Sequence, residues 1–116
     1  MLNPSTADAE KNDATILKTI AFTRAWGRFG GIEVCNLYAY RTVSPAALKA
    51  ARYPVGPQND ATIRALMQVT TESTGIVMAA WGAHAQPNRA LDVYTDAQIL
   101  GVPLYHLGLN KNGSPK

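Results

Sequence analysis

The uninterrupted apolar run Ile76-Val77-Met78-Ala79-Ala80 constrains the fold more than any other stretch of this sequence. A strand with one face in water alternates apolar and polar residues, so a continuous apolar run is typical of a strand covered on both faces. Parallel sheets flanked by helices meet that condition. The run therefore predicts a parallel sheet between two helical layers.

Helix and strand patterns alternate along the rest of the chain. Helices are predicted from Asn12-Asp13 to Gly27, briefly at Ser44-Pro45, from Asn59-Asp60 to about Ser73, and over 88–100. Strands are predicted at 31–37, 76–80 and 103–107, and 38–57 is a long connection. This order predicts an α/β fold, a three-layer α/β/α domain whose short sheet is mostly parallel.

Apolar spacing within the two later helices identifies the side chains expected to face the core. Those of the helix after Asn59 are Ile63, Leu66, Met67 and Thr70, and those of the last helix are Ala90, Leu91, Val93, Tyr94, Ala97 and Ile99.

The first strand is reduced to Met1-Leu2, whereas a central parallel strand normally has about five residues. We therefore expect a chain truncated at its start. Apolar residues beside the missing strand, such as Val34, Ile76 and Met78, should lose neighbours. Marginal stability, or self-association through an exposed strand edge, is the expected consequence.

Length and composition limit the classes of protein to consider. The 116 residues form one domain, 1–116, and 47% hydrophobic with 16% charged residues argues against disorder. The net charge of +3 is compatible with a polyanionic partner. The single Cys35 excludes an internal disulfide, and neither a signal peptide nor a membrane-spanning stretch is recognisable. A cytoplasmic protein that contacts no membrane is expected.

Two polar segments are candidates for binding. The turn after Leu2 contains Pro4, Ser5, Thr6 and Asp8, and it is either an anion- or base-binding turn or simply a frayed terminus. The sequence Asn-Asp-Ala-Thr-Ile occurs at both 12–16 and 59–63. It is either ordinary helix capping or a pair of helix N-termini that open onto one ligand-binding edge.

Other chemistries have little support in the sequence. His84, His106 and Cys35 are not spaced as metal ligands, and no phosphate-binding glycine motif is present, so neither a metal nor a cofactor is expected. Trp81 either stacks on a base or packs under a loop. Tyr38, Tyr40 and Tyr53, with Arg41 and Arg52, form either a stacking and phosphate-contact surface or loop anchors.

A family resemblance adds to this interpretation. The chain resembles the bacterial and phage family called domain of unknown function 1643 over its whole length, in segments 2–8, 12–16, 36–41, 56–60, 80–82 and 107–113. That family has no assigned activity. It is more distantly similar to the uracil-DNA glycosylase superfamily, which implies that Asn3 orients a water molecule and that Asn36 reads a base edge. Arg41, Pro45 and Gly82 also match that pattern.

The sequence lacks one motif of the glycosylase pattern, the one that stabilises the base as it leaves. Those enzymes carry a His-Pro-Ser type motif after the last strand, and its absence here fits a C-terminal truncation. Without that His the leaving-group anion has no obvious stabilising group. His106 and Lys111 are possible substitutes, although a strand histidine is more often structural and a turn lysine is more often solvated.

Two hypotheses follow. One is a glycosylase-like hydrolase with Asn3 as the catalytic residue, and the other is a non-catalytic module that binds a nucleobase, nucleotide or nucleic acid. Because parallel strands end at one edge of a sheet, both hypotheses use the same ligand-binding residues. These are Pro4, Ser5, Thr6, Asp8, Asn12, Asp13, Asn36, Tyr40, Arg41, Asn59, Asp60, Trp81, Gly82 and Lys111.

Overall fold

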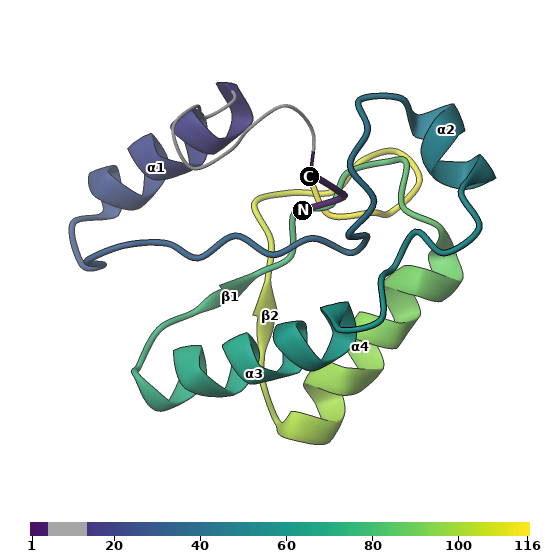
Figure 1. Cartoon of the computed structure of the whole chain (residues 1–116). Coiled ribbons are helices and arrows are strands. Elements are labelled where there is room, and N and C mark those ends of the chain that lie inside the picture. The colour runs from purple at the N-terminus through teal and green to yellow at the C-terminus, as the bar shows by residue number, and fades with distance from the viewer. Residues whose placement is uncertain (5–13) are drawn as a thin grey trace.

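The computed structural model describes residues 1–4 and 14–116 and shows a mixed α/β fold (Figure 1). Its described residues form four helices and a two-stranded parallel sheet. In chain order the elements are α1 (Ala14–Trp26), α2 (Pro45–Ala50), α3 (Asn59–Glu72), β1 (Val77–Met78), α4 (Pro87–Leu100) and β2 (Leu104–Tyr105). The predicted positions of the helices are confirmed, except that the predicted start of the first helix at Asn12-Asp13 lies outside the described residues.

The sheet is a β1–α4–β2 unit. Val77 pairs with Leu104 and Met78 with Tyr105, in parallel register. Parallel neighbours need a long crossover, which α4 provides. The helix begins at Pro87 and ends at Leu100, and it is followed by Gly101, whose φ of 69° is left-handed; proline at a helix start and glycine just past its end are both usual. The predicted parallel pairing is confirmed, but each strand is only two residues long.

The core lies between α3, α4 and one face of the sheet. Helix α3 packs against both α4 and β1. Side chains one helical turn apart are buried on each helix, and the core residues are Leu37, Tyr38, Leu48, Ile63, Met67, Ala79, Trp81, Val93, Ala97 and Val102.

The expected burial of Leu91 and Ile99 is wrong, because they are 61% and 77% exposed. Each residue of an α-helix turns the direction by about 100°. Leu91 is therefore about 200° from its buried neighbours Arg89 and Val93, on the far side of α4.

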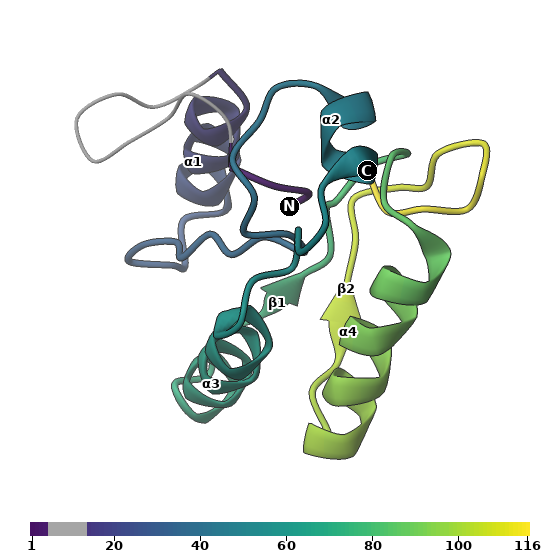
Figure 2. The same ribbon diagram turned by 45° about the vertical axis from the view of Figure 1, so that its right-hand side comes forward.

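Helix α1 lies on the opposite side of β1 from α3 (Figures 1 and 2). Thr23 is its only buried residue, while Leu17, Phe22 and Trp26 are 55%, 43% and 42% exposed. The described residues thus form one well-packed helical layer, made by α3 and α4. The other face of the sheet is only partly covered.

The first two residues lie beside the segment expected to form the second strand. The Met1 amino group donates to the Cys35 carbonyl at 2.8 Å, and the Leu37 N–H donates to the Met1 carbonyl at 2.9 Å. This alternation is typical of parallel neighbours. However, residues 31–37 do not form a regular strand, because Met1 and Leu2 are too few to support a ladder along them.

The sequence predicts that the Met1-Leu2 stub lies between residues 31–37 and 76–80, and this prediction is wrong, because in the described residues the stub pairs with the first segment and not with the second. Within residues 1–4 and 14–116, no backbone hydrogen bond joins this stub to Ile76–Ala80. The self-association expected from an exposed strand edge stays a prediction.

Candidate functional site

Asn3 fastens the long loop that follows the strand end. Its Nδ2 atom donates to the carbonyl oxygens of Pro4, Tyr40 and Thr42 at 3.0, 3.0 and 2.7 Å. The Thr42 N–H in turn donates to the Pro4 carbonyl at 3.1 Å. The amide nitrogen is therefore committed to the backbone. The Oδ1 atom of Asn3 has no partner among the described residues and is the atom left to accept from a ligand or water.

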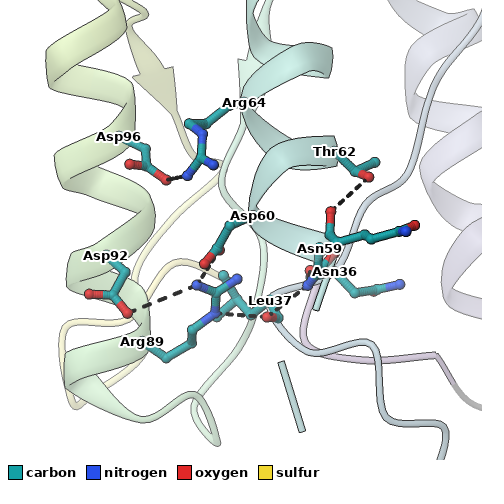
Figure 3. A network of polar contacts seen from close by, with 10 residues as sticks. Asn36, Leu37, Asn59, Asp60, Thr62, Arg64, Arg89, Asp92 and Asp96 are labelled. Carbon is teal, nitrogen blue, oxygen red and sulfur yellow. Dashed lines mark hydrogen bonds and ion pairs between the residues drawn. The ribbon is translucent and has the colours of Figure 1, made fainter. Parts of the chain in front are cut away.

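Asn36 has a fixed main chain and an uncommitted side chain. Asn59 Nδ2 donates to the carbonyls of Asn36 and Leu37 at 2.8 and 3.1 Å. Figure 3 shows the Asn36 side chain directed away from Arg89, and the residue is half-buried. No hydrogen bond of its amide is found in the described part of the chain. A carboxamide that offers both a donor and an acceptor from a rigid position is suited to recognise a base edge.

The expected helix-capping role of Asn59 and Asp60 is wrong, because Gln58 is the N-cap and both residues lie inside the first turn of α3. Asn59 reaches back to the strand end, and Asp60 accepts from Arg89 Nη1 at 2.6 Å. An acidic residue in a first turn is still favoured by the helix dipole. This copy of the repeated sequence therefore joins α3 to the backbone at residues 36–37 and to α4.

Arg89 is the residue of this region that the sequence interpretation missed. Its side chain is only 4% exposed, and its Nε donates to the Leu37 carbonyl at 2.8 Å (Figure 3). The carboxylates of Asp60 and Asp92 lie 2.6 and 3.9 Å from Nη1, while the buried Nη2 has no partner in the described residues. The four-residue spacing from Arg89 to the buried Val93 was the signal for its burial. Its charge is used to hold the network together.

Trp81 and Gly82 follow β1. Trp81 is 6% exposed, and its ring packs edge-to-face on Tyr94 at a centroid distance of 5.3 Å. This packing leaves little of the Trp81 ring for a base. The Gly82 N–H donates to the Pro115 carbonyl at 2.9 Å, so the C-terminal segment lies beside this turn. Lys111, in the same segment, is exposed and has no ion pair among the described residues.

The long loop presents an accessible polar surface. Tyr40 is 45% exposed, and Arg41 is exposed without an ion-pair partner in residues 1–4 and 14–116. Tyr53 is 78% exposed beside a hollow of about 550 Å³ formed by residues 52–57. Tyr38 differs, because it is buried and its hydroxyl accepts from the Gln86 N–H at 3.2 Å. The loop therefore contains both an anchor, Tyr38, and accessible groups.

The structure brings the remaining candidates together in two neighbouring groups. Asn3 holds the loop that carries Tyr40 and Arg41. The Asn36 carbonyl accepts from Asn59, and the next carbonyl, that of Leu37, accepts from Arg89, which in turn binds Asp60. Pairing of the Met1-Leu2 stub with Leu37 and Tyr38 links the two groups. The candidates Ser5, Thr6, Asp8, Asn12 and Asp13 lie outside the described residues. Among those that are described, no cluster of three His, Cys, Asp or Glu side chains is placed to hold a metal.

Comparison with known proteins identifies the family. A family model described as protein of unknown function (DUF1643) matches residues 1–116. The chain belongs to the DUF1643 family. No curated protein and no solved structure matches this DUF1643 chain. In the part of it that the structure describes, no helix has the length and apolar character needed to cross a membrane.

Proposed function

We propose that this DUF1643 domain recognises a nucleobase or nucleotide at the edge formed by Asn3, Asn36 and the loop 40–42, and that it binds without hydrolysing its ligand. The observation that carries the proposal is the Asn36 side chain. Asn59 and Arg89 hold the main-chain carbonyls of Asn36 and Leu37, yet the side-chain amide of Asn36 has no hydrogen bond within residues 1–4 and 14–116. The carboxamide offers a donor and an acceptor to a base edge, and because the backbone below it is already held, binding has to order only the side chain.

Arg41 supplies the second element of recognition. Its exposed guanidinium follows Tyr40, whose carbonyl is fixed by Asn3 at 3.0 Å. A guanidinium forms strong, charge-assisted hydrogen bonds with phosphate oxygens. An amide for the base and a cation for the phosphate together favour a nucleotide over a free base.

Binding is favoured over hydrolysis because the charged groups beside Asn36 neutralise one another. Arg89 is engaged with Asp60, Asp92 and the Leu37 carbonyl. A departing base needs a group that stabilises its developing negative charge. His106 and Lys111 are both exposed, in surroundings where solvent weakens such stabilisation.

A glycosylase-like hydrolase is the second candidate, and it is favoured by the Oδ1 atom of Asn3, which has no partner among the described residues. An acceptor at this position is able to orient a water molecule. The resemblance of the Asn3-Pro4-Ser5 turn to the first motif of the uracil-DNA glycosylase superfamily points the same way. If the chain is such a hydrolase, we expect its helices to cover both faces of the sheet in the three-layer arrangement of the glycosylases.

Titration of Asn36→Ala and Arg41→Ala against nucleosides, nucleotides and short single strands tests the proposal. Asn36→Ala should weaken one base far more than the others, whereas Arg41→Ala should weaken all phosphorylated ligands and reduce the salt dependence. The matched controls are Asn88→Ala, an exposed amide on α4, and Lys49→Ala, an exposed cation on α2. Unchanged base preference in Asn36→Ala would rule out the proposed role, and release of free base from a strand would favour the hydrolase.

A further inference from the structure

A second hollow, of about 430 Å³, lies on the open face of the sheet. Ile76, Met78 and Tyr105 line it from the sheet side. Trp26 and Phe29 line it from the end of α1 and the turn that follows, and Arg28 and His106 complete the lining. None of these residues belongs to the edge formed by Asn3 and Asn36.

The strands leave this face open because their side chains alternate. Val77 and Leu104 pack against the core that α3 and α4 cover. Their neighbours Met78 and Tyr105, which are register partners, line the hollow instead. Tyr105 remains 51% exposed and Trp26 42% exposed. An accessible apolar floor bounded by aromatic rings results.

Two aromatic rings and a guanidinium near the end of α1 form one wall of the hollow. Trp26 and Phe29 meet edge-to-face, with centroids 6.2 Å apart and planes at 73°. The Arg28 guanidinium lies 5.2 Å from the centre of the Phe29 ring. Exposed aromatic faces stack on nucleobases, and an adjacent arginine adds a cation to the same surface.

The charge of this region selects an anionic occupant. Arg24 and Arg28 are exposed and form no ion pair within the described residues, and Glu33 is the one acidic residue of residues 24–33, so positive charge exceeds negative charge in this segment. The same positive charge on both copies would oppose self-association through this face.

We infer that the hollow binds a nucleotide unit, with its base against Trp26 and Tyr105 and its phosphate on Arg28. The ligand chemistry is a planar ring bearing a phosphate, supplied by a free nucleotide or by one position of a single strand. This inference goes beyond the proposed function, because it uses a different face and no shared residue.

Tryptophan fluorescence gives a local test, because Trp26 is exposed and Trp81 is buried. AMP and a short oligothymidylate should quench the exposed tryptophan, while adenosine, which lacks the phosphate, should bind more weakly. Trp26→Phe should abolish the quenching and retain binding in a separate anisotropy measurement. Quenching by the strand alone would identify a strand contact, and quenching by AMP as well would identify a site for free nucleotides.

Variants separate this site from other cationic and aromatic surfaces. Arg28→Ala and Tyr105→Ala should each weaken phosphorylated ligands about tenfold, from one lost charge-assisted contact or one lost stack. Arg52→Ala is the matched control, because its guanidinium also lies over an exposed ring, that of Tyr53 at 5.5 Å, beside the other hollow.

The inference is overturned if no phosphorylated ligand quenches Trp26, or if Arg52→Ala weakens binding as much as Arg28→Ala. Concentration-dependent dimerisation that shields Trp26 would also overturn it, in favour of a second copy as the occupant. Asn36→Ala should leave Trp26 quenching unchanged. Failure at this hollow is therefore distinguishable from failure of the proposed function.

Discussion

The Nε atom of Arg89 donates a hydrogen bond of 2.8 Å to the carbonyl oxygen of Leu37. The same oxygen accepts from Asn59 at 3.1 Å, so both of its lone pairs are used. Arg89 comes from α4, Asn59 from α3, and Leu37 from the segment beside the Met1-Leu2 stub. Three parts of the chain thus meet at one atom, next to the proposed recognition group Asn36.

Replacing Arg89 with alanine should destabilise the fold strongly. The change leaves Asp60 and the Leu37 carbonyl without their cation and opens a buried volume. Loss of one partner of a fully buried ion pair costs about 3–5 kcal/mol, and this is an upper limit here because the remaining Asp60 is 44% exposed to water. Urea unfolding measures the change.

Arg64→Ala is the control for that measurement. Arg64 and Asp96 form a second ion pair between α3 and α4, at 3.3 Å, with side chains that are 45% and 21% exposed. A pair this accessible contributes about 1 kcal/mol or less. Equal effects of the two variants would contradict the assigned role of Arg89.

The helices could be predicted from the sequence more fully than the strands. Gly27 and Gly101 mark the observed ends of α1 and α4, because both residues adopt the left-handed conformation that ends a helix. The length of a strand depends on the neighbouring strands with which it pairs. Those strands lie elsewhere in the chain, so the local pattern of residues does not identify them. Residues 31–37 have a strand-like composition, yet only Met1 and Leu2 pair beside them.

The candidate site could be predicted in its residues but less well in their roles. The sequence points to Asn3 and Asn36 as polar residues at predicted strand ends, and to Asn59 as part of a repeated sequence at a helix start. The three carbonyls that Asn3 contacts and the guanidinium of Arg89 come from distant positions, which a short motif does not encode. Trp81 illustrates the same limit, because its burial against Tyr94 depends on the placement of α4.

Gly56→Ala should shift the loop that carries Arg41. Gly56 has a φ of +86°, and an added Cβ would lie 2.8 Å from the Cβ of Ala39, closer than real contacts allow. A left-handed alanine costs about 1 kcal/mol, and the clash adds to that cost, so about 2 kcal/mol or more is expected. Gly27→Ala, also at positive φ but with open space around it, should cost only the first amount. Similar melting temperatures for both variants would exclude the clash.

Asn3→Asp tests whether Asn3 is needed for the loop, apart from any chemistry. Aspartate has the same shape but places an oxygen, which cannot donate, against the carbonyls of Tyr40 and Thr42. The Thr42 contact is half-buried and the Tyr40 contact is exposed, so we expect a loss of about 1 kcal/mol, the lower end of the cost of an unpaired buried acceptor. Thermal unfolding should therefore show a clear loss of stability in the absence of ligand. A variant as stable as the parent chain would mean that these contacts are dispensable.

The Met1 amino group predicts a pH dependence of stability for a chain produced to begin at Met1. Burial lowers the pKa of this group, which donates to the Cys35 carbonyl at 2.8 Å. In the unfolded chain the group has its ordinary pKa of about 8. The unfolded state therefore binds the proton more readily, and stability rises with pH from the lowered folded pKa up to about 8. Melting temperatures between about pH 6 and about pH 8.5 measure this rise. An Nα-acetylated chain is the control, because it retains His84 and His106 but has no amine to titrate. If both chains show the same pH profile, the Met1 amino group does not contribute.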